Sequence, residues 1–239
     1  MAKKILITND DGIAADGIIR LARAAMDFGE VYVVAPDSER SAASHSITLR
    51  HSIDVRPYDF PVEGVAAFSC SGTPGDCIRV GSLSIMPQRP DVVLTGINFG
   101  YNVASDIQYS ATVGAALEGE FQGYHSIAFS EGIKDCHEVT DRYLKEVLEE
   151  LIDKEYMPGY VYNVNFPHCR LEDCKGILRD RAVSRGSFYK DRYKVVKELD
   201  GGGASYMVDG IFDPVDEEGT DYDAVLSNHI SIGLVKNLC

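Results

Sequence analysis

Two adjacent aspartates follow the first apolar run of the chain. The tetrapeptide Asn9-Asp10-Asp11-Gly12 comes directly after residues 4–8. Neighbouring side chains on a strand point to opposite faces, so both carboxylates can bind one ion only where the backbone leaves the strand, and Gly12 permits such a turn. Paired carboxylates suit a hard cation such as Mg²⁺ or Mn²⁺. A polar turn without a metal is the alternative interpretation.

Two further polar loops also follow apolar runs. Within residues 35–46, Ser41 offers a hydroxyl to a metal or a phosphate, and His45 is a candidate proton donor. Within residues 95–102, Asn98 offers a carbonyl oxygen to a cation and an amide group to an anion. Hydroxyl-rich loops commonly form turns and caps, and a lone histidine is more often a surface residue than a catalyst. Taken alone, neither loop is sufficient to predict a metal or phosphate site.

A helix rich in small residues is expected at 111–122, and Ser110 and Thr112 lie at its start. The N-terminus of a helix favours a bound phosphate. The Walker pattern Gly-Lys-[Ser/Thr] and the dinucleotide pattern Gly-x-Gly-x-x-Gly are both absent from this region, so a simpler anion site is the better interpretation. The segment 72–77 is expected to form a turn with a helix cap, from which Thr73 can line a pocket.

The elements that position these residues alternate between strand and helix patterns. Continuous apolar runs predict buried parallel strands, and the spaced apolar residues between them predict covering helices. The expected strands are 4–8, 31–35, 91–95, 126–130 and 160–165, and the expected helices are 17–28, 111–122 and 139–154. We therefore expect an α/β fold with a three-layer α/β/α Rossmann-like core and a mostly parallel sheet. Ligands of such sheets bind at the carboxyl ends of the strands, which here are the loops 9–17, 36–46 and 96–113.

The character of the chain changes near Pro167. Residues 1–166 carry the α/β pattern and form the predicted catalytic core. Residues 167–239 are charged, contain Gly201-Gly202-Gly203 and show little helical periodicity. We expect this segment to be rich in β-hairpins and to contribute an oligomer contact instead of an independent domain.

Charge and cysteine usage narrow the classes of function. The 23 Lys and Arg residues face 37 Asp and Glu residues, a formal net charge of -14, which opposes binding to a nucleic acid polymer or an anionic membrane. No signal peptide or membrane span is predicted. The six cysteines show no paired ligand spacing, since no second pair accompanies Cys169 and Cys174, so we expect reduced thiols in a cytoplasmic protein.

Taken in order, these segments resemble the SurE family of survival-protein-E phosphatases, which act as 5′-nucleotidases. The stretches that carry the resemblance are ILITNDDGI, VVAPDSERSAASHSIT, SGTPGDC, PDVVLTGINFGYN, YSATVGAALEG and YNVNFP, with GTDYDAVLSNHISI as a fainter match. The resemblance implies a Rossmann-like core and a β-rich carboxyl-terminal part that packs between subunits of a homodimer or homotetramer.

The resemblance also implies a set of site residues. One divalent cation per subunit, Mg²⁺ or Mn²⁺, would be held by Asp10, Asp11, Ser41 and Asn98. Phosphate contacts would come from Asn9, Ser41, Asn98, Asn102, Ser110 and Thr112. Two departures from the family pattern stand out. Asp16 adds a carboxylate near the expected mouth of the site, and Ala111 replaces a glycine, so it lacks glycine's access to a positive φ.

The implied reaction is the hydrolysis of nucleoside monophosphates by metal-activated water, with 3′-nucleotides and short polyphosphate as further substrates. Asp10 or Asp11 would orient the water, and His45 would protonate the departing ribose oxygen. A covalent aspartyl-phosphate at Asp10 is one alternative, although the Asp-x-Asp spacing of one such enzyme class is missing. A non-catalytic nucleotide-binding module is the other alternative.

Overall fold

A single nine-stranded sheet forms the centre of the molecule. The computed structural model describes residues 2–134, 136–187, 189–212 and 217–238. The strand order is β3-β4-β2-β1-β5-β6-β7-β13-β8. The bounds are β1 (Lys3–Thr8), β2 (Gly29–Pro36), β3 (Val55–Pro57), β4 (Ala66–Cys70), β5 (Val92–Phe99), β6 (His125–Glu131), β7 (Tyr160–Phe166), β8 (Ile177–Arg181) and β13 (Ile230–Lys236).

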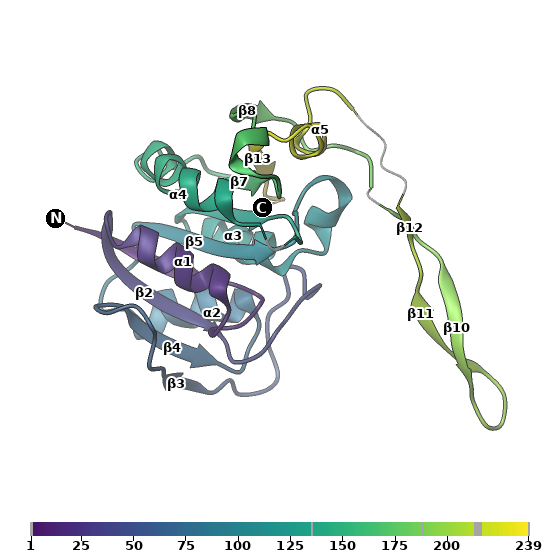
Figure 1. The fold of residues 1–239 in the computed structure, drawn as a ribbon. Helices are drawn as coiled ribbons and strands as arrows, with labels where there is room; N and C mark the ends of the chain where they lie inside the picture. The colour runs from purple at the N-terminus through teal and green to yellow at the C-terminus, as the bar shows by residue number, and fades with distance from the viewer. Residues whose placement is uncertain (1, 135, 188, 213–216, 239) are drawn as a thin grey trace.

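Helices cover both faces of this sheet, as Figure 1 shows. The α-helices are α1 (Asp16–Ala25), α2 (Pro74–Val80), α3 (Ala111–Phe121), α4 (Glu138–Leu151) and α5 (Asp221–Leu226). The helices α1 and α4 pack together on one face, and α2 and α3 pack together on the other. The expected three-layer α/β/α fold is therefore confirmed. Short helical turns occur at η1 (Gly81–Ile85), η2 (Ala104–Gln108) and η3 (Leu171–Asp173).

The direction of the connections reverses between β1 and β5. From β1 the chain moves outward through β2 to β4, and it then crosses back to β5 and moves outward the other way through β6 to β7. The neighbouring strands from β4 to β7 are all parallel. In open parallel sheets the crevice at such a reversal point is where ligands bind. The carboxyl ends of β1 and β5 flank this point.

Burial explains why the apolar runs form strands and the amphipathic segments form helices. Ile5, Leu6 and Ile7 in β1 are fully buried, although successive side chains face opposite sides of the sheet. In α1 the buried residues lie on one stripe, which includes Ile18 and Leu21. The helix α3 is buried almost all round, because its small residues allow close approach on several sides.

A glycine contact brings the start of α1 against the end of β5. A Cβ atom added at Gly17 would lie 2.0 Å from the carbonyl oxygen of Ile97, which no real side chain tolerates. Only glycine therefore permits this approach. The contact draws the loop after β1 toward the loop after β5.

The predicted helices and strands are present, with shifted bounds. The helix expected at 17–28 ends at Ala25, because the chain turns at Met26 and enters β2 at Gly29. The strand expected at 91–95 continues to Phe99, with an irregular register between Thr95 and Asn98. No helix of the described residues is long and apolar enough to cross a membrane.

The carboxyl-terminal segment contributes to two different structures. Its strands β13 and β8 extend the main sheet beyond β7. A separate hairpin of β10 (Tyr193–Glu198) and β11 (Ala204–Val208) projects away from the body, next to the short pair β9 (Tyr189–Lys190) and β12 (Ile211–Phe212) (Figure 1). The expected β-hairpin appendage is thus observed. However, the main sheet does not end with residue 166, because β8 and β13 from the carboxyl-terminal segment belong to it.

The short helix α5 was not expected in this segment. Six residues are too few to show a helical period, which is why the apolar pattern missed it. Its start does carry a local signal. The Thr220 side chain accepts a hydrogen bond from the backbone N–H of Asp223, the arrangement that a Thr-x-x-Asp sequence indicates.

Candidate active site

The loops after β1, β2 and β5 are bonded together at the reversal point of the sheet. The backbone N–H of Arg40 donates to the carbonyl oxygen of Asp10 at 2.7 Å. The backbone N–H of Phe99 donates to Asp11 Oδ2 at 3.2 Å. Residues far apart in the sequence therefore meet at one place. The loops that carry Asp10, Asp11 and Ser41 and the end of β5 that carries Asn98 lie at this edge of the sheet.

Asp10 is buried and bonded to the start of α3. Its side chain is 4 % exposed, and Oδ1 accepts a hydrogen bond from the Thr112 hydroxyl. Burial raises the pKa of Asp10 to about 6, the bond from Thr112 opposes this rise, and the neighbouring Asp11 adds to it. The site thus holds a carboxylate whose charge is poorly stabilised by the protein alone.

Asp11 lies beside Asp10, and its pKa is also raised. Burial raises the pKa of Asp11, the bond from Phe99 partly offsets this, and the carboxylates of Glu39 and Glu131 raise it further. Two partly desolvated carboxylates on adjacent residues repel each other. A bound cation would relieve that repulsion, which is the electrostatic signature expected of a metal site.

Ser41 lies on the loop after β2, and Asn98 lies near the end of β5. Ser41 Oγ donates to Glu39 Oε1 at 2.7 Å, and Asn98 Nδ2 donates to the carbonyl oxygen of Gly100 at 2.8 Å. The bond at Asn98 turns its amide group away and leaves its side-chain oxygen available as an acceptor. The backbone beside Ser41 is strained, because Ala42 and Ser44 have φ values of 58° and 54° without being glycine.

The chemistry of these donors fits a hard divalent cation. Two carboxylates, a hydroxyl and an amide oxygen form an all-oxygen set, which Mg²⁺ and Mn²⁺ prefer. Among the described residues no cluster of three or more His, Cys, Asp or Glu side chains is placed to hold a metal. The predicted set contains only two carboxylates, so a search for three or more such side chains does not test it. The metal site therefore stays a prediction.

The start of α3 is bonded to this edge. Ser110 caps the helix, since its Oγ accepts from the backbone N–H of Val113 at 3.0 Å. Thr112, in the first turn, is the residue that bonds Asp10. Ala111 is the first helical residue and is not among the residues with positive φ, so the family's glycine is not required for this backbone. The N–H groups of the first turn thus lie close to the aspartate pair.

Asn9 and Asn102, both predicted to contact phosphate, are buried and already bonded. Asn9 is fully buried, and its Nδ2 donates to the carbonyl oxygen of Gly12 at 2.9 Å. Asn102 is 5 % exposed, and its Nδ2 donates to Ser130 Oγ at 2.8 Å. Each Nδ2 carries a second N–H, so a phosphate contact does not require the loss of these bonds. In the structure the two amides stabilise the loops that carry the site.

His45 lies against α3 and is fixed by a carboxylate that the sequence patterns missed. Its Nε2 lies 2.8 Å from Glu118 Oε2, and Glu118 also accepts from Arg79 at 3.0 Å. The loop reaches α3 because Gly114 has no Cβ, which would lie 2.5 Å from the carbonyl oxygen of Ser44. His45 and Ser110 line the same large hollow, of about 790 Å³.

Asp11 lines a smaller hollow of about 310 Å³. Its lining includes Asp16, the carboxylate that departs from the family pattern, and Glu131. Glu131 is 4 % exposed and accepts from Arg20 Nη1 at 2.7 Å. The sequence offered no signal for Glu131, because it ends a buried strand and its partner lies 111 residues away.

The fold and the site define a doubly wound α/β protein with paired aspartates at the reversal point of its sheet. A family model described as "Survival protein SurE" matches residues 5–187. The chain belongs to the SurE family, as the sequence motifs predicted.

Solved and curated relatives agree over nearly the whole chain. A protein named "5'-nucleotidase SurE" from Thermosipho melanesiensis is 36% identical over 230 residues, 95% of this chain and 89% of that protein. One of the same name from Geobacter metallireducens is 37% identical over 237 residues, 96% of this chain and 89% of that protein. The crystal structure of the SurE protein from Aquifex aeolicus aligns with a TM-score of 0.83 at 34% identity, covering 99% of this chain and 94% of that one.

Proposed function

We propose that this protein is a divalent-metal-dependent phosphatase that hydrolyses nucleoside monophosphates as a 5′-nucleotidase. The observation that carries the proposal is the pair of the buried Asp10 and the half-buried Asp11 at the reversal point. Thr112 bonds Asp10 to the first turn of α3. A cation site and an anion-binding helix N-terminus thereby lie side by side. The family relatives named 5'-nucleotidase support the same reaction.

Each residue of the site has a part in this reaction. Asp10, Asp11, Ser41 and Asn98 would hold one Mg²⁺ or Mn²⁺ ion. When bound, the cation neutralises phosphate charge and lowers the pKa of a water molecule. Either aspartate can accept a proton from the attacking water, and the first turn of α3 receives the phosphate oxygens through its N–H groups.

The proton for the leaving group would come from the side where His45 lies. His45 and Ser110 line one hollow, so a nucleotide whose phosphate sits at Ser110 can extend its ribose toward the imidazole. Glu118 Oε2 lies 2.8 Å from His45 Nε2 and holds the ring in place. The same arrangement accepts 3′-nucleotides or short polyphosphate if their terminal phosphate reaches α3, and these remain substrates to be tested.

Phosphate release from a panel of nucleoside 5′- and 3′-monophosphates tests the proposal. The assay is run with EDTA, Mg²⁺ or Mn²⁺ on the wild type and on Asp11→Asn. Asp153→Asn is the matched control, since Asp153 pairs with Lys3 at the opposite edge of the sheet. Release that requires metal and is lost only in Asp11→Asn supports the phosphatase. Release that is absent or independent of metal contradicts it.

The covalent and non-catalytic alternatives give different outcomes in the same experiment. A covalent mechanism at Asp10 leaves an acid-stable phosphoenzyme that hydroxylamine cleaves. The burial of Asp10 and its bond to Thr112 favour a ligand role over a nucleophilic one. A binding module would retain nucleotide in equilibrium dialysis without releasing phosphate.

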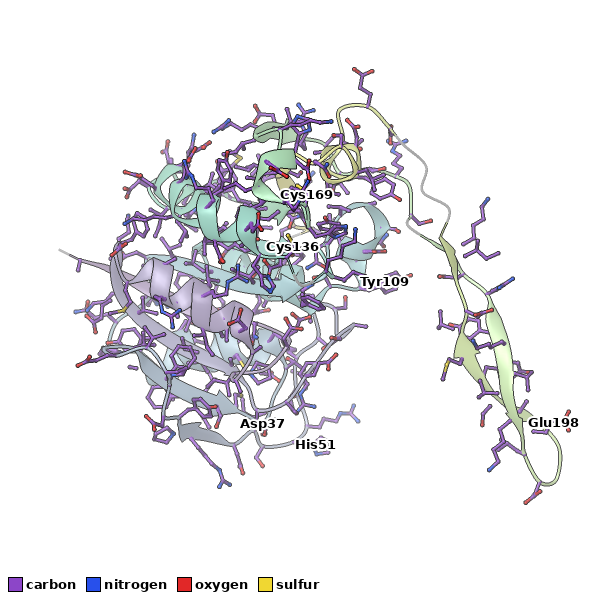
Figure 2. The ribbon with its side chains drawn as sticks, in the orientation of Figure 1. Asp37, His51, Tyr109, Cys136, Cys169 and Glu198 are labelled. Carbon is purple, nitrogen blue, oxygen red and sulfur yellow. The ribbon has the colours of Figure 1, made fainter. Side chains whose placement is uncertain are left out.

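We also propose that the protein is a homo-oligomer and that the hairpin carries the contact. Side chains of the hairpin point outward, with Glu198 at its far end (Figure 2). Its exposed apolar residues are Tyr193, Val195, Val196, Tyr206, Met207 and Val208. A lone two-stranded hairpin is only marginally stable in water, so these side chains need a covering surface. A second copy of the chain, forming a homodimer or homotetramer, supplies one.

A further inference from the structure

The large hollow beside α3 is built from segments that are distant in the sequence. The loop after β2 contributes Ser44 and His45, α3 contributes Ser110 and Leu117, and the ends of the carboxyl-terminal segment contribute residues 183–185 and 235–238. Its volume of about 790 Å³ lies within the range of small-molecule sites. It can therefore enclose a whole nucleotide.

The charge of this hollow is opposite to that of the protein. The chain has 37 acidic residues, yet no Asp or Glu is among the described residues that line the hollow. Arg185 and Lys236 line it from two different segments. Among the described residues neither of these cations takes part in an ion pair. An unpaired cationic wall in an acidic protein favours an anionic ligand.

The carboxylate nearest to His45 does not reverse this polarity. This residue, Glu118, is 3 % exposed and bonds His45, Arg79 and Gln122. Burial tends to raise the pKa of Glu118, but the hydrogen bonds from His45 and Gln122 outweigh burial, and its pKa lies below the ordinary value. The Glu118 carboxylate is therefore ionised and hydrogen-bonded to these three partners. It does not line the hollow, so it adds no negative charge to its wall.

The hollow begins where the proposed phosphate site ends. Ser110 both caps α3 and lines the hollow, so a phosphate at the first turn of α3 leaves the rest of its nucleotide facing this space. Ile107, Leu117 and Val235 provide an apolar wall against which a base can pack. Arg185 and Lys236 line the same hollow.

We propose that this hollow binds the nucleoside side of the substrate and that Arg185 and Lys236 select nucleotides with a second phosphate group. The proposal rests on the phosphatase function given above. A nucleoside 3′,5′-bisphosphate is the simplest such substrate. In its hydrolysis the water oxygen bonds to the 5′ phosphorus, the bond between phosphorus and O5′ breaks, and O5′ leaves with a proton. The products are a nucleoside 3′-phosphate and inorganic phosphate.

The test compares two substrates that differ by one phosphate. The wild type is expected to show a kcat/KM for adenosine 3′,5′-bisphosphate about tenfold above that for adenosine 5′-monophosphate, the size expected for charge-assisted bonds. Arg185→Ala and Lys236→Ala should each reduce this ratio, and the double variant should bring it close to one. Arg89→Ala removes an exposed cation before β5, at the opposite edge of the sheet, and should keep the wild-type ratio.

Direct binding separates this proposal from the phosphatase function. Calorimetry with adenosine 3′,5′-bisphosphate on the EDTA-treated protein should show affinity that the double variant loses, even if no phosphate is ever released. Tripolyphosphate, which has no base or ribose, is the second probe. If it competes with adenosine 3′,5′-bisphosphate for binding, Arg185 and Lys236 recognise phosphate groups whether or not a nucleoside is attached. Equal ratios in the wild type and the double variant, or unchanged binding, overturn the proposal. Arg185→Gln keeps the side-chain length and serves if the alanine variant does not fold.

Discussion

The carboxyl edge of the sheet and the projecting hairpin are organised in opposite ways. At the edge, three loops are bonded to one another, and the central residue Asp10 is 4 % exposed. In the hairpin, every residue of β10 is exposed, and the strands pair only with each other. The proposed active site at the edge is therefore formed by one chain alone, whereas the exposed hairpin is proposed to pack against a second copy of the chain. Changes in one region should leave the function of the other intact.

The largest effect is expected from Asp10→Asn, which removes a charge from the proposed metal set. We expect kcat/KM for nucleoside monophosphates to fall about 10²- to 10³-fold, a typical loss when a group that stabilises developing charge is removed. Steady-state kinetics with Mg²⁺ or Mn²⁺ measure it, and light scattering should show an unchanged oligomer. The control is Asp209→Asn in the hairpin. A fall of similar size in the control would erase the contrast between the regions.

The next effect concerns the stability of the metal-free protein. Because the pKa of Asp10 rises from 3.8 to about 6 on folding, the folded state binds the proton more tightly than the unfolded state. The free energy of unfolding should therefore fall as pH rises from about 4 to above 6, by up to about 3 kcal/mol. Urea titrations with EDTA measure this slope.

Asp10→Asn serves as the reference for that pH dependence, because it cannot ionise. Its unfolding free energy should lack this component and should exceed that of the wild type above pH 6 in EDTA. Saturating metal should restore the wild type, since a ligand that binds only the folded state stabilises it. If the stability of the wild type relative to Asp10→Asn rose with pH over this interval, the role assigned to Asp10 would be contradicted.

A smaller effect is expected from glycine substitutions. Gly17→Ala places a Cβ atom 2.0 Å from the Ile97 carbonyl oxygen and should destabilise the core by about 1–3 kcal/mol. Gly201→Ala in the hairpin turn meets no atom within 4 Å, although its φ of 85° still costs about 1 kcal/mol. Urea unfolding monitored by circular dichroism compares the two variants. A greater loss of core stability in Gly201→Ala would mean that the hairpin supports the core.

The smallest effect on catalysis is expected from the hairpin surface. Val195 and Tyr206 face each other across β10 and β11. Replacing them together, by Val195→Lys and Tyr206→Glu, removes apolar surface while an ion pair keeps the strands paired. Light scattering should show a smaller assembly, and kcat/KM should stay within about threefold because distant sites act independently. Leu83→Lys, on the body, is the control; an unchanged mass in the double variant rejects the hairpin contact.

The location of the four proposed metal ligands could be predicted from the strand pattern, whereas their role as a metal set stays a prediction. Asp10, Asp11, Ser41 and Asn98 lie at the ends of β1, β2 and β5, and parallel strands bring such ends together. The alternation of apolar runs and amphipathic segments was also sufficient for the order of the elements. The prediction of bounds was weaker, since Gly29 ends the turn after α1 through its contact with Lys3, 26 residues earlier.

The remaining features depend on contacts between distant residues. Glu118 meets His45 across 73 residues, and Glu131 meets Arg20 across 111. No local sequence pattern predicts either pair, because the sequence around a glutamate does not show whether its side chain is buried or exposed. The insertion of β13 between β7 and β8 is likewise decided by packing. The polarity of the large hollow could not be predicted for the same reason.

Metal binding by the isolated protein tests the central claim, that the paired aspartates at the reversal point form a cation site. Electron paramagnetic resonance can count free Mn²⁺ in a titration of the wild type, Asp11→Asn and the control Asp153→Asn. We expect one ion per chain in the wild type and the control, and an affinity at least about tenfold weaker in Asp11→Asn. Equal binding by Asp11→Asn, or none by the wild type, would contradict the site.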